Sequence, residues 1–154
     1  MKTTLLFWLL LLPLAPLSAQ MISGQDTLYG NEWIDYDKDY YRIAVAEDGI
    51  YRIPQELLLS AGLDVAGTAG SRYQLWRMGQ EVPLYVSSTG PLQPGDYLEF
   101  YGQKNRSELD RFLFEDPQTM LNPWYSLYTD TMAYYLTVLA PGEEGLRYEE
   151  VENE

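Results

Sequence analysis

Residues 41–53 have the sequence YRIAVAEDGIYRI, in which two runs of alternating side chains flank a short acidic break. Apolar residues alternate with polar or small ones over residues 41–45, which is the period of a strand with one buried face. The pair Asp48-Gly49 readily adopts the positive φ angles that a tight turn requires. The stretch therefore predicts a β-hairpin, in which the extended run over residues 50–53 pairs with residues 41–45.

A second hairpin is predicted around Met78-Gly79. Residues 71–77 and residues 80–86 both have an extended pattern, and the glycine supplies the conformational freedom that a two-residue turn needs. Asparagine in place of Met78 would make the turn signal stronger. Pro83 has no backbone N–H, so we expect the returning strand to have one free edge.

One short helix and further strands complete the predicted fold. Pro54 suits the first turn of a helix and Gly62 suits a left-handed cap, so residues 55–61 are expected to be helical. The other expected elements are a turn at residues 93–96, strands over residues 97–101 and 134–139, and a helical turn near residues 107–112. Short strands separated by turns predict a mainly β fold, an antiparallel sandwich or partly closed barrel with one short helix.

The N-terminus has the three parts of a signal peptide. Lys2 precedes an apolar run over residues 5–12, and Leu17-Ser18-Ala19 offers a small residue at the cleavage point. The apolar run is shorter than the roughly 20 residues that a membrane-spanning helix needs. We therefore expect residues 1–19 to be a signal peptide, cleavage after Ala19, and an exported chain with no transmembrane segment.

The mature chain is expected to form one domain between two polar ends. Residues 20–32 are polar and aperiodic, which predicts a flexible N-terminus. The predicted β-rich domain spans residues 33–140. Residues 141–154 hold six glutamates and few apolar side chains, and we expect an acidic linker or the truncated start of a further domain there.

The composition is acidic and rich in tyrosine. The chain has 23 acidic and 10 basic residues, a net charge of −13, and loss of Lys2 with the signal peptide makes this −14. Nucleic acid is therefore a poor partner, because phosphate backbones are held by clustered Lys and Arg. The 14 tyrosines indicate a β-rich core and its flanks, or alternatively an aromatic platform for sugar.

Histidine and cysteine are both absent from the sequence. Their absence removes the Ser-His-Asp and Cys-His nucleophile systems and most zinc sites. Chemistry by paired carboxylates, as in glycoside hydrolysis, remains open in principle. The sequence assigns no catalytic, cofactor-binding or metal-ligating residue and no cofactor, so we expect the chain not to be an enzyme.

One acidic cluster imitates the start of a calcium loop, with Asp35, Asp37 and Asp39 at alternate positions. Tyr40 stands where such a loop needs its glycine, and Ala46 stands where it needs the bidentate glutamate. If the segment is extended, the three carboxylates share one solvated face of a strand. We therefore expect calcium dependence to be weak or absent.

The order and spacing of the motifs resemble the N-terminal region of gingipain-type cysteine peptidases, and most closely that of PorU-like sortases of type IX secretion. The motifs are YRIAVAEDGIYRI at residues 41–53, QLWRMGQEVPL at 74–84, GDYLEFYG at 95–102, LDR at 109–111 and NPWYSLYTD at 122–130. The resemblance covers roughly residues 31–140. Each motif alone is ordinary hairpin chemistry.

The resemblance implies a non-catalytic β domain that precedes the peptidase domain of a large surface protein. The catalytic His and Cys of the family belong to that later domain, and no residue of this chain matches them. The implied location is the periplasm, outer membrane or cell surface of a gram-negative bacterium. The implied partners are neighbouring domains or type IX secretion components, and the chain would be a truncated or split product.

Two other functions stay open beside this scaffold or interaction domain. A free-standing surface binding module, for glycan for example, would use Trp76, Trp124, Tyr125 and Tyr128 as stacking surfaces. A small carboxylate hydrolase would need two carboxylates that converge in one pocket. Burial of the four rings, and the placement of the carboxylates, distinguish these functions.

Overall fold

The computed structural model describes residues 21–23, 26–28, 30–108, 110–114, 116–122 and 124–149. The chain divides into two units, Met1–Glu32 and Trp33–Glu154. In the first unit, β1 (Met21–Ser23) and β2 (Asp26–Leu28) form an antiparallel hairpin. The predicted flexibility of residues 20–32 stays a prediction, but their aperiodic pattern did not indicate this hairpin. The predicted signal peptide lies outside the described residues.

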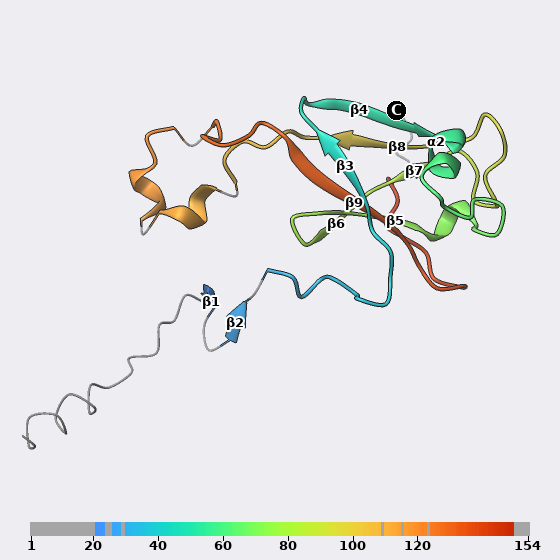
Figure 1. The fold of residues 1–154 in the computed structure, drawn as a ribbon, viewed down its shortest axis with the longest axis horizontal. Coiled ribbons are helices and arrows are strands. Elements are labelled where there is room, and N and C mark those ends of the chain that lie inside the picture. The colour runs from blue at the N-terminus through green and yellow to red at the C-terminus, as the bar shows by residue number, and fades with distance from the viewer. Residues whose placement is uncertain are drawn as a thin grey trace, which may run out of the picture. The chain divides into compact units, whose positions relative to one another are not determined.

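The second unit contains two antiparallel sheets (Figure 1). The four-stranded sheet has the order β3 (Tyr41–Val45), β9 (Met132–Val138), β5 (Tyr73–Arg77) and β6 (Gln80–Val82). The three-stranded sheet has the order β4 (Gly49–Pro54), β8 (Tyr97–Gly102) and β7 (Tyr85–Val86). The prediction of a mainly β, sandwich-like fold is confirmed, and the two sheets do not close into a barrel.

The prediction of a hairpin at Asp48-Gly49 is wrong. β3 pairs with β9 and β4 pairs with β8, so residues 46–48 carry the chain from one sheet to the other. Gly49 does not adopt a positive φ and is simply the first residue of β4. Strand pairing is decided by which partner buries the apolar face, and here each strand finds that partner far along the chain.

The hairpin predicted at Met78-Gly79 is confirmed. Both turn residues have positive φ, 50° and 76°, as a two-residue turn between right-twisted strands requires. β5 and β6 pair from Arg77 opposite Gln80 to Leu75 opposite Val82. The returning strand is shorter than predicted, because the chain leaves the sheet at Pro83 and continues as β7 in the other sheet.

The short helix α2 (Gln55–Ser60) lies where the sequence predicted it, and Gly62 has the expected positive φ of 92°. Short 3₁₀ turns occupy Gly70–Arg72, Asp110–Leu113 and Pro117–Thr119. The turn at residues 93–96 is closed by a bond from Asp96 N to the Gln93 carbonyl, 2.9 Å long. Asp96 also accepts the Gln93 N–H, and this backbone bond is the main reason that the pKa of Asp96 is lowered.

The core lies between the two sheets. Its largest fully buried side chains include Tyr73, Tyr134, Phe100, Leu75, Leu84 and Leu98. Phe100 joins the sheets, because its ring centroid lies 5.6 Å from Tyr51 in the same sheet and 5.1 Å from Tyr134 in the other. Burial raises the pKa of Tyr73 to about 12, and its hydroxyl has no hydrogen-bond partner among the described residues.

The outer face of the four-stranded sheet is covered by Trp33. Its ring centroid lies 5.5 Å from those of Trp76 and Tyr135, which are paired neighbours on β5 and β9. Tyr40 contacts Trp33 edge to face at the same distance. Many tyrosines therefore pack in the core or on its flanks. This agrees with the first of the two interpretations of the tyrosine content.

Within the predicted acidic linker or truncated start of a further domain, residues 143–149 pack on the β domain. The guanidinium of Arg147 donates to the carbonyls of Gly70, Ser71 and Tyr73 at 2.6 to 3.1 Å. Leu146 accepts the Leu84 N–H at 3.0 Å. The polar composition of the segment predicts exposure to solvent. The contacts that hold it are made to backbone carbonyls of the domain, and amino-acid composition gives no information about such contacts.

Candidate interaction surface

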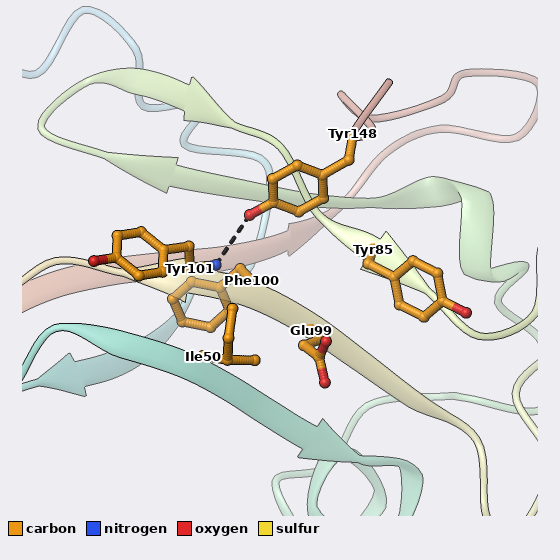
Figure 2. Close-up of a pocket in the computed structure, with 6 residues that line it drawn as sticks. All are labelled: Ile50, Tyr85, Glu99, Phe100, Tyr101 and Tyr148. Atoms are coloured by element: carbon orange, nitrogen blue, oxygen red, sulfur yellow. Dashed lines mark hydrogen bonds between the residues drawn. The ribbon is translucent and has the colours of Figure 1, made fainter. Parts of the chain in front are cut away.

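The outer face of the three-stranded sheet carries large apolar side chains that are exposed to solvent. We call it the β8 face and define it by Ile50, Tyr85, Tyr101 and Tyr148, which are all exposed (Figure 2). Ile50 on β4 lies opposite Tyr101 on β8, so strand alternation places both on the same side of the sheet. Ile50 is 65% exposed and Tyr101 is 47% exposed, although both have bulky side chains suited to burial.

The β8 face is hollowed around these side chains. A shallow cavity of about 280 Å³ is lined by Ile50, Tyr85, Glu99, Phe100, Tyr101 and Tyr148. The hydroxyl of Tyr148 accepts the Tyr101 N–H at 3.0 Å, so the C-terminal segment forms one wall (Figure 2). The surface is therefore built from β4, β7, β8 and the C-terminal segment together.

An ion pair borders the apolar part of the β8 face. Arg52 contacts Glu99 at 2.8 Å, and its guanidinium lies 4.0 Å from the ring centroid of Tyr97. The hydrogen bond to Glu99 is the main reason that the pKa of Arg52 is raised. Arg52 and Glu99 neutralise each other in the isolated domain. The β8 face is therefore mainly apolar in character.

A second exposed apolar surface lies on the segment between β8 and β9. We call the described residues from 110 to 128 the aromatic projection, because they extend away from the two sheets (Figure 1). Its exposed large side chains are Leu113, Leu121, Trp124, Tyr125, Leu127 and Tyr128. Phe114, Met120 and Leu121 also line a cavity of about 170 Å³ within it.

Two buried polar side chains hold the aromatic projection. Asp110 accepts bonds from Ser126 Oγ at 3.0 Å and from the Leu127 N–H at 2.9 Å. Asn105 donates from its side chain to the Thr129 carbonyl at 2.9 Å. Because Asp110 and Asn105 are 4% and 2% exposed, these bonds are shielded from water and keep the two ends of the segment together.

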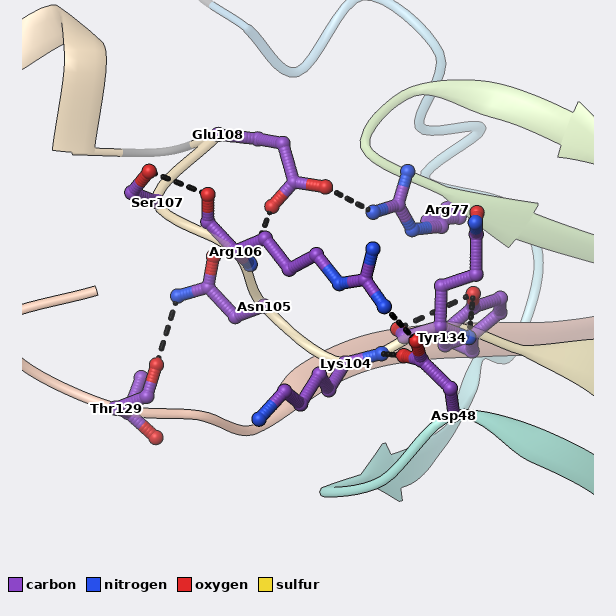
Figure 3. Close-up of polar contacts among 10 residues, drawn as sticks. Asp48, Arg77, Lys104, Asn105, Arg106, Ser107, Glu108, Thr129 and Tyr134 are labelled. Carbon is purple, nitrogen blue, oxygen red and sulfur yellow. Dashed lines mark hydrogen bonds and ion pairs between the residues drawn. The ribbon is translucent and has the colours of Figure 1, made fainter. Parts of the chain in front are cut away.

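Charged pairs join the base of the projection to the sheets (Figure 3). Arg106 pairs with Asp48 in the connection between β3 and β4, and Arg77 pairs with Glu108 at 2.7 Å. Burial by itself would raise the pKa of Glu108, but bonds from the Arg106 N–H and from Arg77 outweigh it and lower that pKa. The segment is therefore held in place by directional contacts at its root.

The four predicted stacking residues do not form one platform. Trp76 is half-buried beneath Trp33, so its face is unavailable to a sugar. Trp124 and Tyr125 are exposed and line a cavity of about 230 Å³ with Lys104 and Arg106. Tyr128 is exposed on the same projection but does not line that cavity.

The cluster Asp35, Asp37 and Asp39 lies in a turn, so the alternative of an extended strand with one solvated face is wrong. Asp35 accepts the Asp37 N–H at 3.1 Å, and this bond is the main reason that its pKa is lowered. Lys38 pairs with the same carboxylate at 3.4 Å. The residues that the structure describes contain no group of three or more acidic side chains arranged to hold a metal ion.

Carboxylates do meet in one cavity, as the hydrolase interpretation requires. Asp37, Asp39 and Asp64 line a space of about 400 Å³ together with Lys38. A glycoside hydrolase also needs one acid in a low-dielectric environment. All three aspartates are exposed, and Asp64 accepts the Gly67 N–H at 2.9 Å. The cavity thus meets one of the two requirements.

The residues of the β8 face were not singled out from the sequence, although a signal was present. Over residues 97–101, YLEFY, aromatic or apolar side chains occupy both phases of the strand alternation. A strand with one solvated face normally carries polar residues in one phase. Tyr101 lies in the phase that should be polar. An aromatic residue at that position indicates that the outer face of the strand is also partly apolar.

No protein-family model, curated protein or solved structure matches this chain. No helix in the described part of the chain is long and apolar enough to cross a membrane.

Proposed function

We propose that this chain is a non-catalytic interaction domain of an exported protein, the N-terminal β domain of a gingipain-like peptidase or type IX secretion sortase. In this role it packs against a neighbouring domain and contributes no reacting group. The observation that carries the proposal is the exposed apolar surface of the β8 face. The family assignment itself rests on the order of the sequence motifs.

The β8 face has the chemistry of a domain interface. Contiguous exposed apolar surface usually marks a binding surface, and tyrosine is enriched at interfaces because it combines a large apolar ring with a polar end. Tyr148 contributes to this face through its bond with the Tyr101 N–H, so the C-terminal segment is part of the surface.

A free-standing surface binding module is the second candidate function. The exposure of Trp124 and Tyr125 beside Lys104 and Arg106 favours it, because exposed rings can stack on a sugar ring. The burial of Trp76 beneath Trp33 reduces the predicted platform from four rings to three. The two functions use different surfaces, so they can be tested separately.

The test joins this chain to the domain that follows in a gingipain-like peptidase and compares thermal unfolding of the joined and isolated forms at low protein concentration. We expect the joined form to melt several degrees higher, because the β8 face becomes covered. Ile50→Lys should remove this gain. Leu121→Lys on the aromatic projection is the matched control and should keep it.

Two results would overturn the proposal. The first is that the isolated chain binds no hydrophobic dye and melts as high as the joined form. The second is that Leu121→Lys removes the gain while Ile50→Lys does not, because the covered surface would then be the aromatic projection.

A further inference from the structure

The cavity of about 400 Å³ that contains Asp37, Asp39 and Asp64 lies where three segments of the β domain meet. Its lining comes from the residues just before and at the start of β3, from residues 62–68 after α2, and from Thr137 and Val138 of β9. It shares no lining residue with the cavity of the β8 face, so the two surfaces are separate. A volume of this size is typical of small-ligand pockets, which span about 300 to 1,000 Å³.

Two hydrogen bonds fix the walls of this cavity. Thr137 donates from its side chain to the Asp39 carbonyl at 2.8 Å, which ties the segment before β3 to β9. Asp64 accepts the Gly67 N–H at 2.9 Å, which closes the loop after α2. Because these contacts exist without a ligand, a ligand does not have to order the walls when it binds.

Two of the three carboxylates are free to bind a ligand. The side chains of Asp37 and Asp39 make no hydrogen bond or ion pair with the residues that the structure describes. Lys38 also lines the cavity, but its ammonium pairs with Asp35, which does not line it. The cavity therefore holds negative charge that the described part of the domain does not neutralise.

The hydroxyl of Thr68 also lacks a partner. Thr68 is 7% exposed and lines the cavity. Its side chain makes no hydrogen bond with the described residues, although buried polar groups are normally hydrogen-bonded. A ligand that donates an N–H inside the cavity would give this hydroxyl a partner.

The remaining lining of the cavity is partly apolar. Leu63, Tyr41 and Val138 belong to the hydrophobic core or pack against it, and each also lines the cavity. Carboxylates beside an apolar wall complement a ligand that carries a positive charge on an aliphatic stem. A metal ion fits less well, because the described residues contain no group of three or more acidic side chains arranged to hold one.

We propose that this cavity binds a primary ammonium group on an aliphatic stem, as in a small diamine or a lysine side chain. An ammonium has three N–H donors, and its bonds to carboxylates are charge-assisted. The free carboxylates of Asp37 and Asp39 and the hydroxyl of Thr68 are the acceptors. The net charge of −13 favours this ligand, because it attracts cations toward the domain.

The test is isothermal titration calorimetry of the full chain with 1,5-diaminopentane and with a blocked tripeptide that has a central lysine. We expect binding, and the probe that binds more tightly identifies the source of the ammonium. Asp39→Asn should weaken binding at least about tenfold, because a charged acceptor is lost. Thr68→Val keeps the shape of the side chain and should weaken binding about threefold, because a neutral acceptor is lost.

Two controls separate a site from general attraction to an acidic chain. Glu149→Gln removes one exposed carboxylate outside the cavity and should leave the affinity unchanged. Tetramethylammonium carries a positive charge without an N–H donor and should bind at least about tenfold more weakly. Circular dichroism checks that each variant is folded.

The absence of binding by both probes would overturn the proposal. Equal losses of affinity in Asp39→Asn and Glu149→Gln would overturn it as well, because binding would then depend on the overall charge. The same holds if tetramethylammonium binds as tightly as the two probes, because the hydrogen bonds would then contribute nothing.

Discussion

At the scale of single residues, Glu108 shows how one carboxylate supports an irregular segment. It accepts the Arg106 N–H at 2.6 Å and contacts Arg77 of β5 at 2.7 Å. These bonds favour the charged carboxylate, and they lower its pKa although partial burial acts in the opposite direction. Glu108 therefore stabilises the base of the aromatic projection only while it is ionised.

We predict that Glu108→Gln makes the stability of the chain less sensitive to acid. With a lowered pKa, the folded chain holds fewer protons than the unfolded chain just below the ordinary pKa of glutamate. The contribution of Glu108 is thus complete near neutral pH and is lost as the pH falls through its folded pKa. Between about pH 6 and pH 3, the variant should lose roughly 1 to 3 °C less in Tm than the wild type.

Thermal unfolding followed by circular dichroism measures this difference. Glu149→Gln is the control, because Glu149 is exposed outside the helices and strands, and the variant removes one exposed carboxylate. An acid profile of Glu108→Gln identical to that of the wild type would mean that the contact with Arg77 does not stabilise the fold.

At the scale of elements, the C-terminal segment is a structural part of the β domain. Gly145 is buried, and a Cβ there would lie 2.4 Å from the Tyr73 carbonyl oxygen. Burial lowers the pKa of Arg147, while its five guanidinium N–H groups suit the carbonyls that surround it. The segment also lies beside β6, where the Glu81 carboxylate accepts the Leu146 N–H at 2.6 Å.

We predict that Arg147→Ala destabilises the domain by about 1 to 3 kcal/mol, because the carbonyls of Gly70, Ser71 and Tyr73 lose their charged donor. The expected fall in Tm is several degrees. Urea unfolding of the variant, with the exposed Glu149→Ala as control, measures this change. If Arg147→Ala is as stable as Glu149→Ala, the bonds of the Arg147 guanidinium do not stabilise the fold.

At the scale of the whole molecule, the acidic charge raises the question of specific cation binding. The 23 carboxylates attract cations in general, but the cluster Asp35, Asp37 and Asp39 offers no preformed calcium site. Lys38 already lies 3.4 Å from one carboxylate oxygen of Asp35. An ammonium in that position competes with a cation for the same negative charge.

We predict that calcium at 1 mM or less shifts the Tm of the full chain by less than about 1 °C relative to chelator, because a ligand that does not bind the folded state cannot stabilise it. Differential scanning calorimetry with calcium, with magnesium and with chelator measures the shift. Magnesium reports the general effect of a divalent cation on an acidic chain. A shift of several degrees with calcium alone would contradict this prediction.

Features that depend only on neighbouring residues can be predicted from the local sequence. The turn at Met78-Gly79, the helix α2 with its cap at Gly62, and the strands at residues 41–45 and 97–101 all follow from local conformational preference and alternation. The absence of His and Cys likewise limits the possible chemistry, whatever fold the chain adopts. These inferences needed no knowledge of distant contacts.

The tertiary structure alone decided which strands pair and which surfaces stay exposed. β3 and β4 are adjacent in sequence, yet β3 pairs with β9 near the end of the domain and β4 pairs with β8. The exposure of the β8 face and the docking of Arg147 depend on the same long-range arrangement. Pairing and exposure follow from how two sheets share one core, and alternation within a strand carries no information about its partner.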